Sequence, residues 1–273
     1  MARGRLTAVY APTARPGSVD VDCPRPTGEH AEPGTIMDQS PNFDRAAGGL
    51  VRRAPVLSLC FHGIGAPGER ALEPQEDSFW VAADAFEEML DVIAQGPRVG
   101  ITFDDGNASD AQIALPALLS RGLGASFFVI AGRLDEPGSL SRAEVRELAR
   151  RGMTVGCHGL RHRNWRRLDE DGIREEFVTA RQLISEAAGE PVREAACPFG
   201  EYDRRVLHEL RRQGFSRAYT IDGRPARRPD AWLQHRYIVR SDDTPERIAA
   251  LARDPRRATD FLRSLKRATK RWR

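Results

Sequence analysis

Residues 99–106 read Val-Gly-Ile-Thr-Phe-Asp-Asp-Gly, an apolar run that ends on two adjacent carboxylates and a glycine. The run Val99 to Phe103 has the length and the β-branched and aromatic content of a buried strand, and Gly106 favours a turn directly after it. An aspartate that caps a following helix would give a similar pattern. Two carboxylates in a partly apolar cleft, however, cannot both stay ionised at low cost unless a cation lies between them or their roles differ.

The sequence on either side of this stretch alternates between two kinds of segment. Four further apolar runs are predicted to be strands: Val56–Phe61, Ala125–Ile130, Met153–Cys157 and Glu194–Cys197. Apolar residues recur at helical spacing in Ala83–Ala94, Ala111–Ser120, Arg142–Arg151, Gly172–Ala188 and Arg204–Gln213. This alternation predicts an α/β fold of repeated βα units around a largely parallel sheet. Because neither GxGxxG nor GxxxxGK[ST] occurs, we favour a barrel over an open doubly wound sheet, in one domain over residues 54–254.

Two flanking segments differ from this domain. Residues 1–53 are rich in Pro, Gly, Asp and Arg with little periodicity, which predicts a disordered tail. Residues 255–273 form a basic amphipathic pattern, which suits a helix on a membrane surface or an acidic partner, or a helix packed on the barrel with a solvated basic face. The chain shows no signal-peptide core and no stretch of roughly twenty apolar residues, so a cytoplasmic location is expected.

Net charge and cysteine content indicate which partners and which cellular compartment to expect. The formal net charge is +3, and the arginines are interleaved with Asp and Glu through the centre of the chain, so nucleic acid is not expected as a partner. The four cysteines, Cys23, Cys60, Cys157 and Cys197, form no CxxC pair, and three of them lie in apolar runs. This usage predicts free buried thiols in a reducing compartment, without disulfides.

A pair of histidines, His158 and His162, follows the predicted strand Met153–Cys157. On a helical turn, a spacing of four residues places two imidazoles on one face, within reach of a single ion. Taken alone, a pair at this spacing is weak evidence, and two surface histidines are the commoner explanation. Together with the carboxylates at the end of another strand, it favours a site of two histidines and one aspartate for a divalent metal ion such as zinc.

Three ordered motifs resemble those of the polysaccharide deacetylase family, also called the NodB homology domain: Thr102–Gly106, His158–His162 and Cys197–Gly200. The opening segment Phe61–Ile64 is also similar, and the resemblance spans about Pro55 to Val239. It implies a distorted, incomplete (β/α) barrel of about seven units. The family is one of metal-dependent hydrolases of amide bonds.

The resemblance also implies roles for individual residues. Asp105, His158 and His162 would hold the metal, which could be zinc, cobalt, nickel or iron. Asp104 would act as the general base, and the backbone N–H of Phe199 would help to bind the oxyanion.

The third motif departs from the family pattern at Ala196, where many members have an arginine that pairs with the base. A subgroup with a small residue there resembles this sequence, and in it an arginine on a late strand, matching Arg236, takes that place. The neighbouring His235 matches a late histidine that serves as general acid in other members. Side chains alternate along a strand, so the two residues can face opposite ways, and Arg236 is preferred for the pocket. His62 is either a third imidazole near the pocket or a polar strand cap.

The expected activity is the removal of N-acetyl groups from an amino-sugar polysaccharide, oligosaccharide or glycan precursor, so that an N-acetylated carbohydrate is the expected partner. A metal-dependent hydrolase that opens the C–N bond of a small ureide or cyclic imide is the alternative. A non-catalytic sugar-binding domain fits less well, because both carboxylates and both histidines are present.

Overall fold

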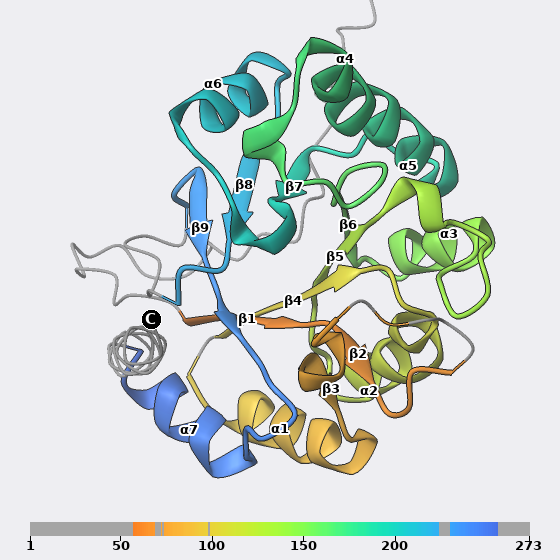
Figure 1. Cartoon of the computed structure of the whole chain (residues 1–273). Coiled ribbons are helices and arrows are strands. Elements are labelled where there is room, and N and C mark those ends of the chain that lie inside the picture. The colour runs from red at the N-terminus through yellow and green to blue at the C-terminus, as the bar shows by residue number, and fades with distance from the viewer. Residues whose placement is uncertain (1–56, 69–71, 73, 98, 224–229, 256–273) are drawn as a thin grey trace, which may run out of the picture. The chain divides into compact units, whose positions relative to one another are not determined.

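The computed structural model describes residues 57–68, 72, 74–97, 99–223 and 230–255. Eight strands form one parallel sheet in the order β10-β1-β4-β5-β6-β7-β8-β9, with helices on its outer side (Figure 1). The strands are β1 (Leu57–Phe61), β4 (Val99–Asp105), β5 (Ser126–Val129), β6 (Thr154–Cys157), β7 (Glu194–Ala196), β8 (Arg217–Thr220), β9 (Leu233–His235) and β10 (Tyr237–Ile238). A separate two-stranded sheet joins β2 (Gly63–Ile64) to β3 (Trp80–Val81).

The two ends of the large sheet are joined by one short segment of chain. Strand β9 pairs with β8 and strand β10 pairs with β1, and a single residue, Arg236, separates them. The N–H of Arg236 donates to the carbonyl of Thr220 at 2.9 Å, and the N–H of Gly223 donates to the carbonyl of Arg236 at 2.9 Å. The eight strands therefore occupy seven positions around a nearly closed barrel, because β9 and β10 are parts of one segment. This confirms the predicted distorted, incomplete (β/α) barrel.

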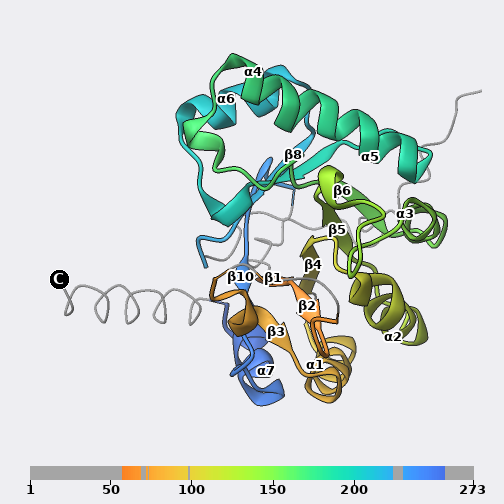
Figure 2. The same ribbon diagram turned by 45° about the vertical axis from the view of Figure 1, so that its right-hand side comes forward.

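The helices follow the predicted apolar periodicity closely. The described α-helices are α1 (Ala83–Gln95), α2 (Leu115–Ser120), α3 (Arg142–Arg150), α4 (Glu170–Ile173), α5 (Ala180–Ala188), α6 (Arg204–Arg212) and α7 (Pro245–Arg253). The π-helical segments η2 (Asp110–Ala114) and η5 (Arg174–Thr179) precede α2 and α5. Short 3-10 turns are η1 (Glu76–Phe79), η3 (Ala131–Arg133), η4 (Trp165–Arg167) and η6 (Pro198–Gly200). Helix α7 packs beside α1 (Figure 2).

Helix α7 is absent from the predicted elements, although its start carries two local signals. Thr244 caps the helix by accepting a hydrogen bond from the N–H of Arg247, and Pro245 occupies the first helical position. Both features favour a helix start.

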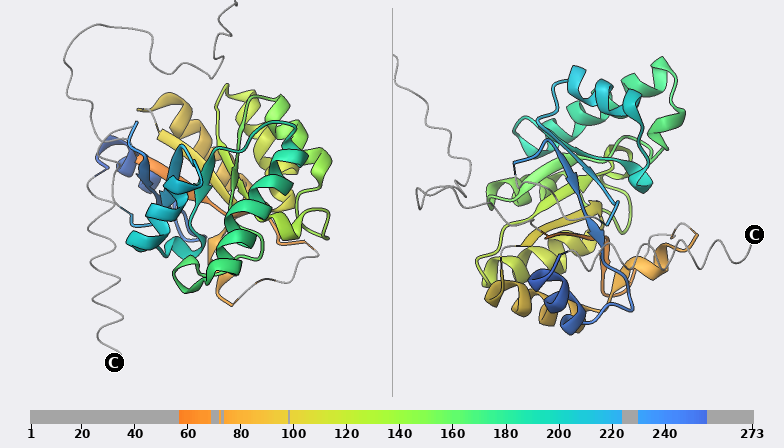
Figure 3. Two further views of the ribbon diagram at one scale, coloured as in Figure 1. Left: turned by 90° about the horizontal axis from the view of Figure 1, so that it is seen from above. Right: turned by 90° about the vertical axis from the view of Figure 1, so that its left-hand side faces the viewer.

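Alternation along the strands divides the barrel into an outer layer and an interior. The outward rings of Phe103 and Phe127 stack at 4.7 Å between centroids and pack with Phe61 and with Phe86 of α1. Helices surround the strands of the large sheet in both views of Figure 3. Because successive side chains on a strand point to opposite faces, the neighbour Asp104 faces the barrel interior.

Two predicted segments lie wholly or almost wholly outside the residues that the structure describes. The expected tail at residues 1–53 and all but the first residue of the expected basic helix at 255–273 lie outside the described residues. Cys60, Cys157 and Cys197 are buried free thiols, whereas Cys23 is outside the described part. Among the described helices, none is long and apolar enough to cross a membrane.

Candidate active site

Asp104 and Asp105 are the last two residues of β4, and both are buried. Asp105 has a left-handed backbone (φ 78°), which ends the strand before Gly106 (φ 72°). Neither carboxylate caps the next helical segment, since η2 begins at Asp110 after Ser109 and without a side-chain cap. The two acids are therefore not explained by helix capping.

Asp105 lies opposite the two histidines of the second motif. Its Oδ1 is 3.5 Å from Nε2 of His158 and 3.6 Å from Nε2 of His162. One ligand atom from each of the three residues lies within 4.8 Å of the other two. The Oδ1 atom is buried and accepts no hydrogen bond from the protein. A buried carboxylate oxygen without a donor, facing two imidazole nitrogens, fits a divalent cation.

The environment of His158 holds its ring in the form that binds metal. Its Nδ1 is 2.9 Å from the carbonyl oxygen of Ala196, so Nδ1 carries the proton and Nε2 keeps its lone pair toward Asp105. Burial lowers the pKa of His158 to about 4, even though the carboxylate of Asp104 acts in the opposite direction. The imidazole is therefore neutral at physiological pH.

The prediction that the two histidines share a helical turn is wrong. Residues 158–162 form a loop after β6, with positive φ at Gly159 (85°) and at His162 (53°). The loop still brings the two imidazoles together, with 5.1 Å between ring centroids. A left-handed backbone at two positions is incompatible with a helical turn. The two histidines, four residues apart, are therefore brought together by a loop and not by a helix.

Asp104 is held by Arg236 from the segment that closes the barrel. Nη1 of Arg236 donates to Oδ1 at 2.6 Å and Nη2 donates to Oδ2 at 2.8 Å, and Nη1 also donates to Oγ1 of Thr102 at 3.0 Å. The arginine is 0% exposed. Burial by itself would raise the pKa of Asp104, but the charge and hydrogen bonds of Arg236 together with the nearby His158 and His62 outweigh it and hold that pKa well below the usual range.

The barrel interior also explains why an arginine at position 236 can be accommodated. Its guanidinium carbon lies 5.4 Å from the ring centroid of Phe128 and 5.6 Å from that of Tyr219. These two rings pack with Ala196 in a small interior cluster. The short side chain of Ala196 leaves this volume to the guanidinium that arrives from the closing segment.

His235 faces away from Asp104. Its Nδ1 lies 2.9 Å from Oδ2 of Asp222 and 3.2 Å from Oγ1 of Thr220, and the hydroxyl of Tyr202 donates to the same Asp222 oxygen at 2.7 Å. The alternation between His235 and Arg236 thus places the arginine inside and the histidine in a separate polar cluster.

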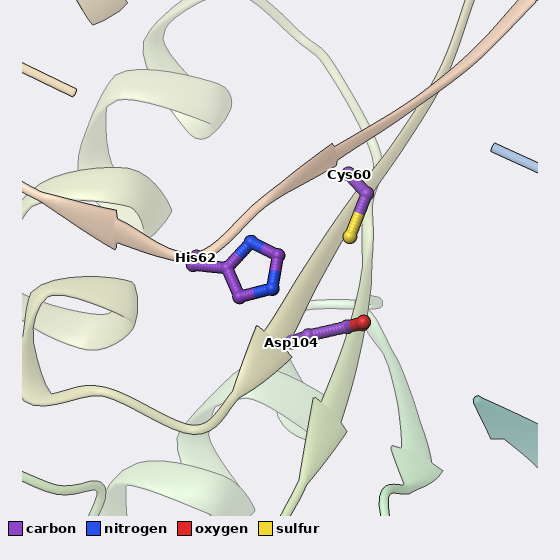
Figure 4. A group of neighbouring side chains, drawn as sticks. All are labelled: Cys60, His62 and Asp104. Atoms are coloured by element: carbon purple, nitrogen blue, oxygen red, sulfur yellow. The ribbon is translucent and has the colours of Figure 1, made fainter. Parts of the chain in front are cut away.

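His62, unlike His235, lies close to the aspartates of the site. It follows β1 and stacks on Phe79 with 5.2 Å between ring centroids. Ligand atoms of His62, Cys60 and Asp104 lie within 4.8 Å of one another, and Figure 4 shows these side chains converging. Its Nδ1 is buried without a hydrogen-bond partner. Of the two interpretations of His62, the structure favours an imidazole near the pocket.

The group of Cys60, His62 and Asp104 fits a cation less well than the Asp105 group. Both oxygens of Asp104 already accept hydrogen bonds from the positively charged Arg236. Burial raises the pKa of the Cys60 thiol, so the sulfur stays protonated although Arg236 acts in the opposite direction. Asp105 with His158 and His162 is therefore the better metal site.

Phe199 lies beside the metal-ligand group, within the η6 turn. Its backbone is left-handed (φ 58°), its side chain is 50% exposed, and its ring packs on that of His162 with 4.3 Å between centroids. Among the described residues, five non-glycine residues have positive φ, and three of them, Asp105, His162 and Phe199, lie here. Such strain tends to concentrate at functional sites.

This arrangement agrees with the comparison to known proteins. Residues 92–218 match the sequence profile of the polysaccharide deacetylase family, and this range contains all three motifs that carry the resemblance, which is thereby confirmed. YxkH of Bacillus subtilis (strain 168), whose name places it among these proteins, is 24% identical over 173 residues, which cover 63% of this chain and 60% of YxkH. The match therefore spans less than two thirds of that relative.

Solved structures show the same fold at low sequence identity. BA0330 of Bacillus anthracis, named as a polysaccharide deacetylase, has a TM-score of 0.63 at 20% identity, over 72% of this chain and 69% of that one. The deacetylase PplD of Streptococcus pyogenes, in complex with acetate, has a TM-score of 0.62 at 18% identity, over 72% of this chain and 98% of that one.

Proposed function

We propose that the protein is a metal-dependent hydrolase that removes N-acetyl groups from an amino-sugar glycan. The observation that carries the proposal is the convergence of Asp105, His158 and His162 beside a separate carboxylate, that of Asp104. The positive charge of Arg236, which donates two hydrogen bonds to this carboxylate, favours its ionised form. The family match supports the reaction class. The acetate bound to PplD is the product expected of a deacetylation, and it supports the same class for this chain.

In this proposal, Asp105, His158 and His162 hold one divalent ion. Mixed nitrogen and oxygen donors suit zinc, and cobalt, nickel and iron accept the same set. When bound, such an ion polarises the acetamide carbonyl and lowers the pKa of a water molecule. Three protein ligands leave room for these oxygens, as in other catalytic sites of this kind.

Asp104 serves as the general base. The Arg236 charge keeps its carboxylate ionised at neutral pH. Each carboxylate oxygen has two lone pairs, so an oxygen that accepts one hydrogen bond from Arg236 can still take a proton from the attacking water. The bidentate contact also fixes the plane of the carboxylate.

Two further groups complete the proposed reaction. The backbone N–H of Phe199, in the turn against His162, donates to the oxyanion that forms when the acetamide carbon is attacked. His62, within reach of Asp104, protonates the leaving amine. His235 is not assigned this step, because it pairs with Asp222.

An acetate-release assay tests the proposal. N-acetylated oligosaccharides of different lengths are compared with one ureide and one cyclic imide, and acetate is expected from the sugars only. Activity lost to a chelator should return with zinc or cobalt. Turnover of the ureide or imide without acetate release would instead assign the protein to small-molecule C–N hydrolysis.

Metal binding is measured separately by elemental analysis of protein purified without added metal. One divalent ion per chain is expected, and His158→Ala and His162→Ala should each lose it. His208→Ala on the exposed side of α6 is the matched control and should retain the ion. Equal metal content in all three variants would show that the ion is held elsewhere.

A further inference from the structure

A buried glutamate on the π-helical segment η5 contacts the loop that carries both histidines. Glu176 is 0% exposed. Its Oε2 accepts a hydrogen bond from the N–H of Leu160 at 2.9 Å, and its Oε1 accepts one from the N–H of Arg161 at 3.0 Å. The indole N–H of Trp165 donates to Oε2 at 3.4 Å. Leu160 and Arg161 lie between His158 and His162, so one carboxylate binds the centre of the proposed metal loop.

The opposite side of the same loop is held by the η3 turn. The N–H of Ala131 donates to the carbonyl of Gly159, and the N–H of Gly132 donates to the carbonyl of Leu160, both at 2.9 Å. The carbonyl groups of Gly159 and Leu160 are thus held by backbone from one side, whereas the N–H groups of Leu160 and Arg161 donate to Glu176. Because no strand or helix pairing holds these N–H groups, the glutamate is what fixes this part of the loop.

Gly159 is complementary to this carboxylate. A Cβ atom built at Gly159 would collide with Oε2 of Glu176, and the backbone there is left-handed (φ 85°). The carboxylate therefore occupies the space that a side chain at position 159 would take. A glycine at position 159 is therefore required for the Glu176 carboxylate to reach the loop.

A carboxylate suits this position better than an amide. Three N–H donors point at its two oxygens, which compensates for the burial of a negative charge. A glutamine would have to direct its own NH₂ group at one of these donors. Glu176 and its neighbour Phe177 are both buried on the π-helical segment η5, and such segments often occur at functional sites.

We propose that Glu176 is a positioning residue that sets the affinity of the metal site by fixing the loop between its two histidine ligands. The inference rests on the proposed metal site at Asp105, His158 and His162. Outer partners that orient metal ligands typically change metal affinity by roughly ten- to a hundredfold when they are removed. The same weakening is expected when the Glu176 carboxylate is lost.

The test compares Glu176→Gln with Glu175→Gln in the full chain. Glu175 is the neighbouring residue, and its contacts with the same loop are exposed ion pairs at 3.9 and 3.7 Å to Arg161 and Arg163. Zinc affinity is measured by competition with a chromophoric chelator, and the thermal stability of the metal-free protein is measured in parallel. We expect zinc to bind roughly ten- to a hundredfold more weakly to Glu176→Gln, and within about twofold of the parent to Glu175→Gln.

Amide hydrogen exchange provides a readout that does not depend on metal. The N–H groups of Leu160 and Arg161 should exchange slowly in the metal-free parent and much faster in Glu176→Gln, without a comparable change in the strands. Glu176→Asp keeps the charge but is one methylene shorter, and it should weaken zinc binding as well. It replaces Glu176→Gln if the glutamine variant does not fold.

Zinc affinity and amide exchange that match the parent in a folded Glu176 variant would overturn the inference. A parent that binds no zinc would instead remove the proposed metal function, and slow exchange at Leu160 and Arg161 would then show a loop contact without a metal role. Faster exchange with unchanged zinc affinity would also reject the positioning role, because the loop would be shown not to control the site.

Discussion

The guanidinium of Arg236 donates two hydrogen bonds, of 2.6 and 2.8 Å, to the carboxylate of Asp104, which lies 132 residues earlier in the sequence. Arg236 is also the single residue between β9 and β10, the two halves of the segment that joins the ends of the sheet. The point at which the barrel closes is therefore also the point at which the proposed base is held. Closure and ionisation of the base depend on the same few residues.

Replacement of Arg236 should move the acidic limb of the kcat/KM profile. The Arg236 charge lowers the pKa of Asp104, so Arg236→Ala raises that pKa and shifts the limb to higher pH, with bound metal unchanged. Lysine should rescue only in part, because it retains the charge without the two-pronged geometry. Breaking a buried ion pair should also lower the free energy of unfolding by about 3–5 kcal/mol.

Arg217→Ala is the matched control for Arg236, since Arg217 lies on β8 and pairs with Glu194 at 3.4 Å. Its pH profile should match the parent. If Arg236→Ala retains both the parental acidic limb and the parental maximum rate, Arg236 does not control the ionisation of Asp104.

Substitution of the two neighbouring aspartates should affect metal binding and kcat differently. Asp105→Asn should lose metal and activity together, because it removes the unpartnered oxygen that faces both histidines. Asp104→Asn should retain the ion and lose about a hundredfold or more in kcat, as for removal of a general base. Elemental analysis and steady-state kinetics on the same samples measure both. Equal metal loss in the two variants would contradict the division of labour.

The alkaline limb of the kcat profile tests the assignment of His62, rather than His235, as the proton donor. A general acid must be protonated to act, so His62→Gln should lower kcat and abolish the alkaline limb of the kcat profile. His235→Gln should leave that limb in place, because His235 is engaged with Asp222. An alkaline limb lost in His235→Gln and retained in His62→Gln would reverse the assignment.

The metal-free protein should lose stability below neutral pH because of His158. Burial depresses the pKa of His158 from 6.5 to about 4 in the folded state. The unfolded chain therefore binds the proton first, and this contribution to stability is present above pH 6.5 and lost as the pH falls toward 4. The loss corresponds to roughly 3 kcal/mol at full extent.

Urea unfolding of the metal-free parent and His158→Gln at several pH values in this window measures the effect. The variant should show a flatter dependence by that amount, because it cannot take up the proton. Identical slopes in the two proteins would show that His158 is already accessible to protons in the folded state.

Much of the fold and the local motifs could be predicted from the sequence. The strand β4 with Asp104 and Asp105 at its end is encoded within eight consecutive residues, and the predicted helix Ala83–Ala94 differs from α1 by one residue at its end. Such features depend on periodicity and on short spacings, which are properties of neighbouring residues. The resemblance to a family added Arg236, which no local pattern indicates.

Other features were decided only by the tertiary structure. The His158–His162 spacing is compatible with a helical turn, and only the contacts of the loop with η3 and Glu176 select the left-handed backbone that is present. Glu176 has no sequence signal, because a glutamate in a helical segment is ordinary unless its buried partner is known. The choice between His62 and His235 likewise depends on which strand faces reach the interior.

The sequence by itself therefore determined which residues stand at the ends of the strands and which types of ligand they offer. The tertiary structure decided which of them meet. The reason is that parallel strands bring their carboxyl ends to one rim whatever their separation in the chain, and closure of the sheet between β8 and β1 then turns Arg236 inward and His235 outward.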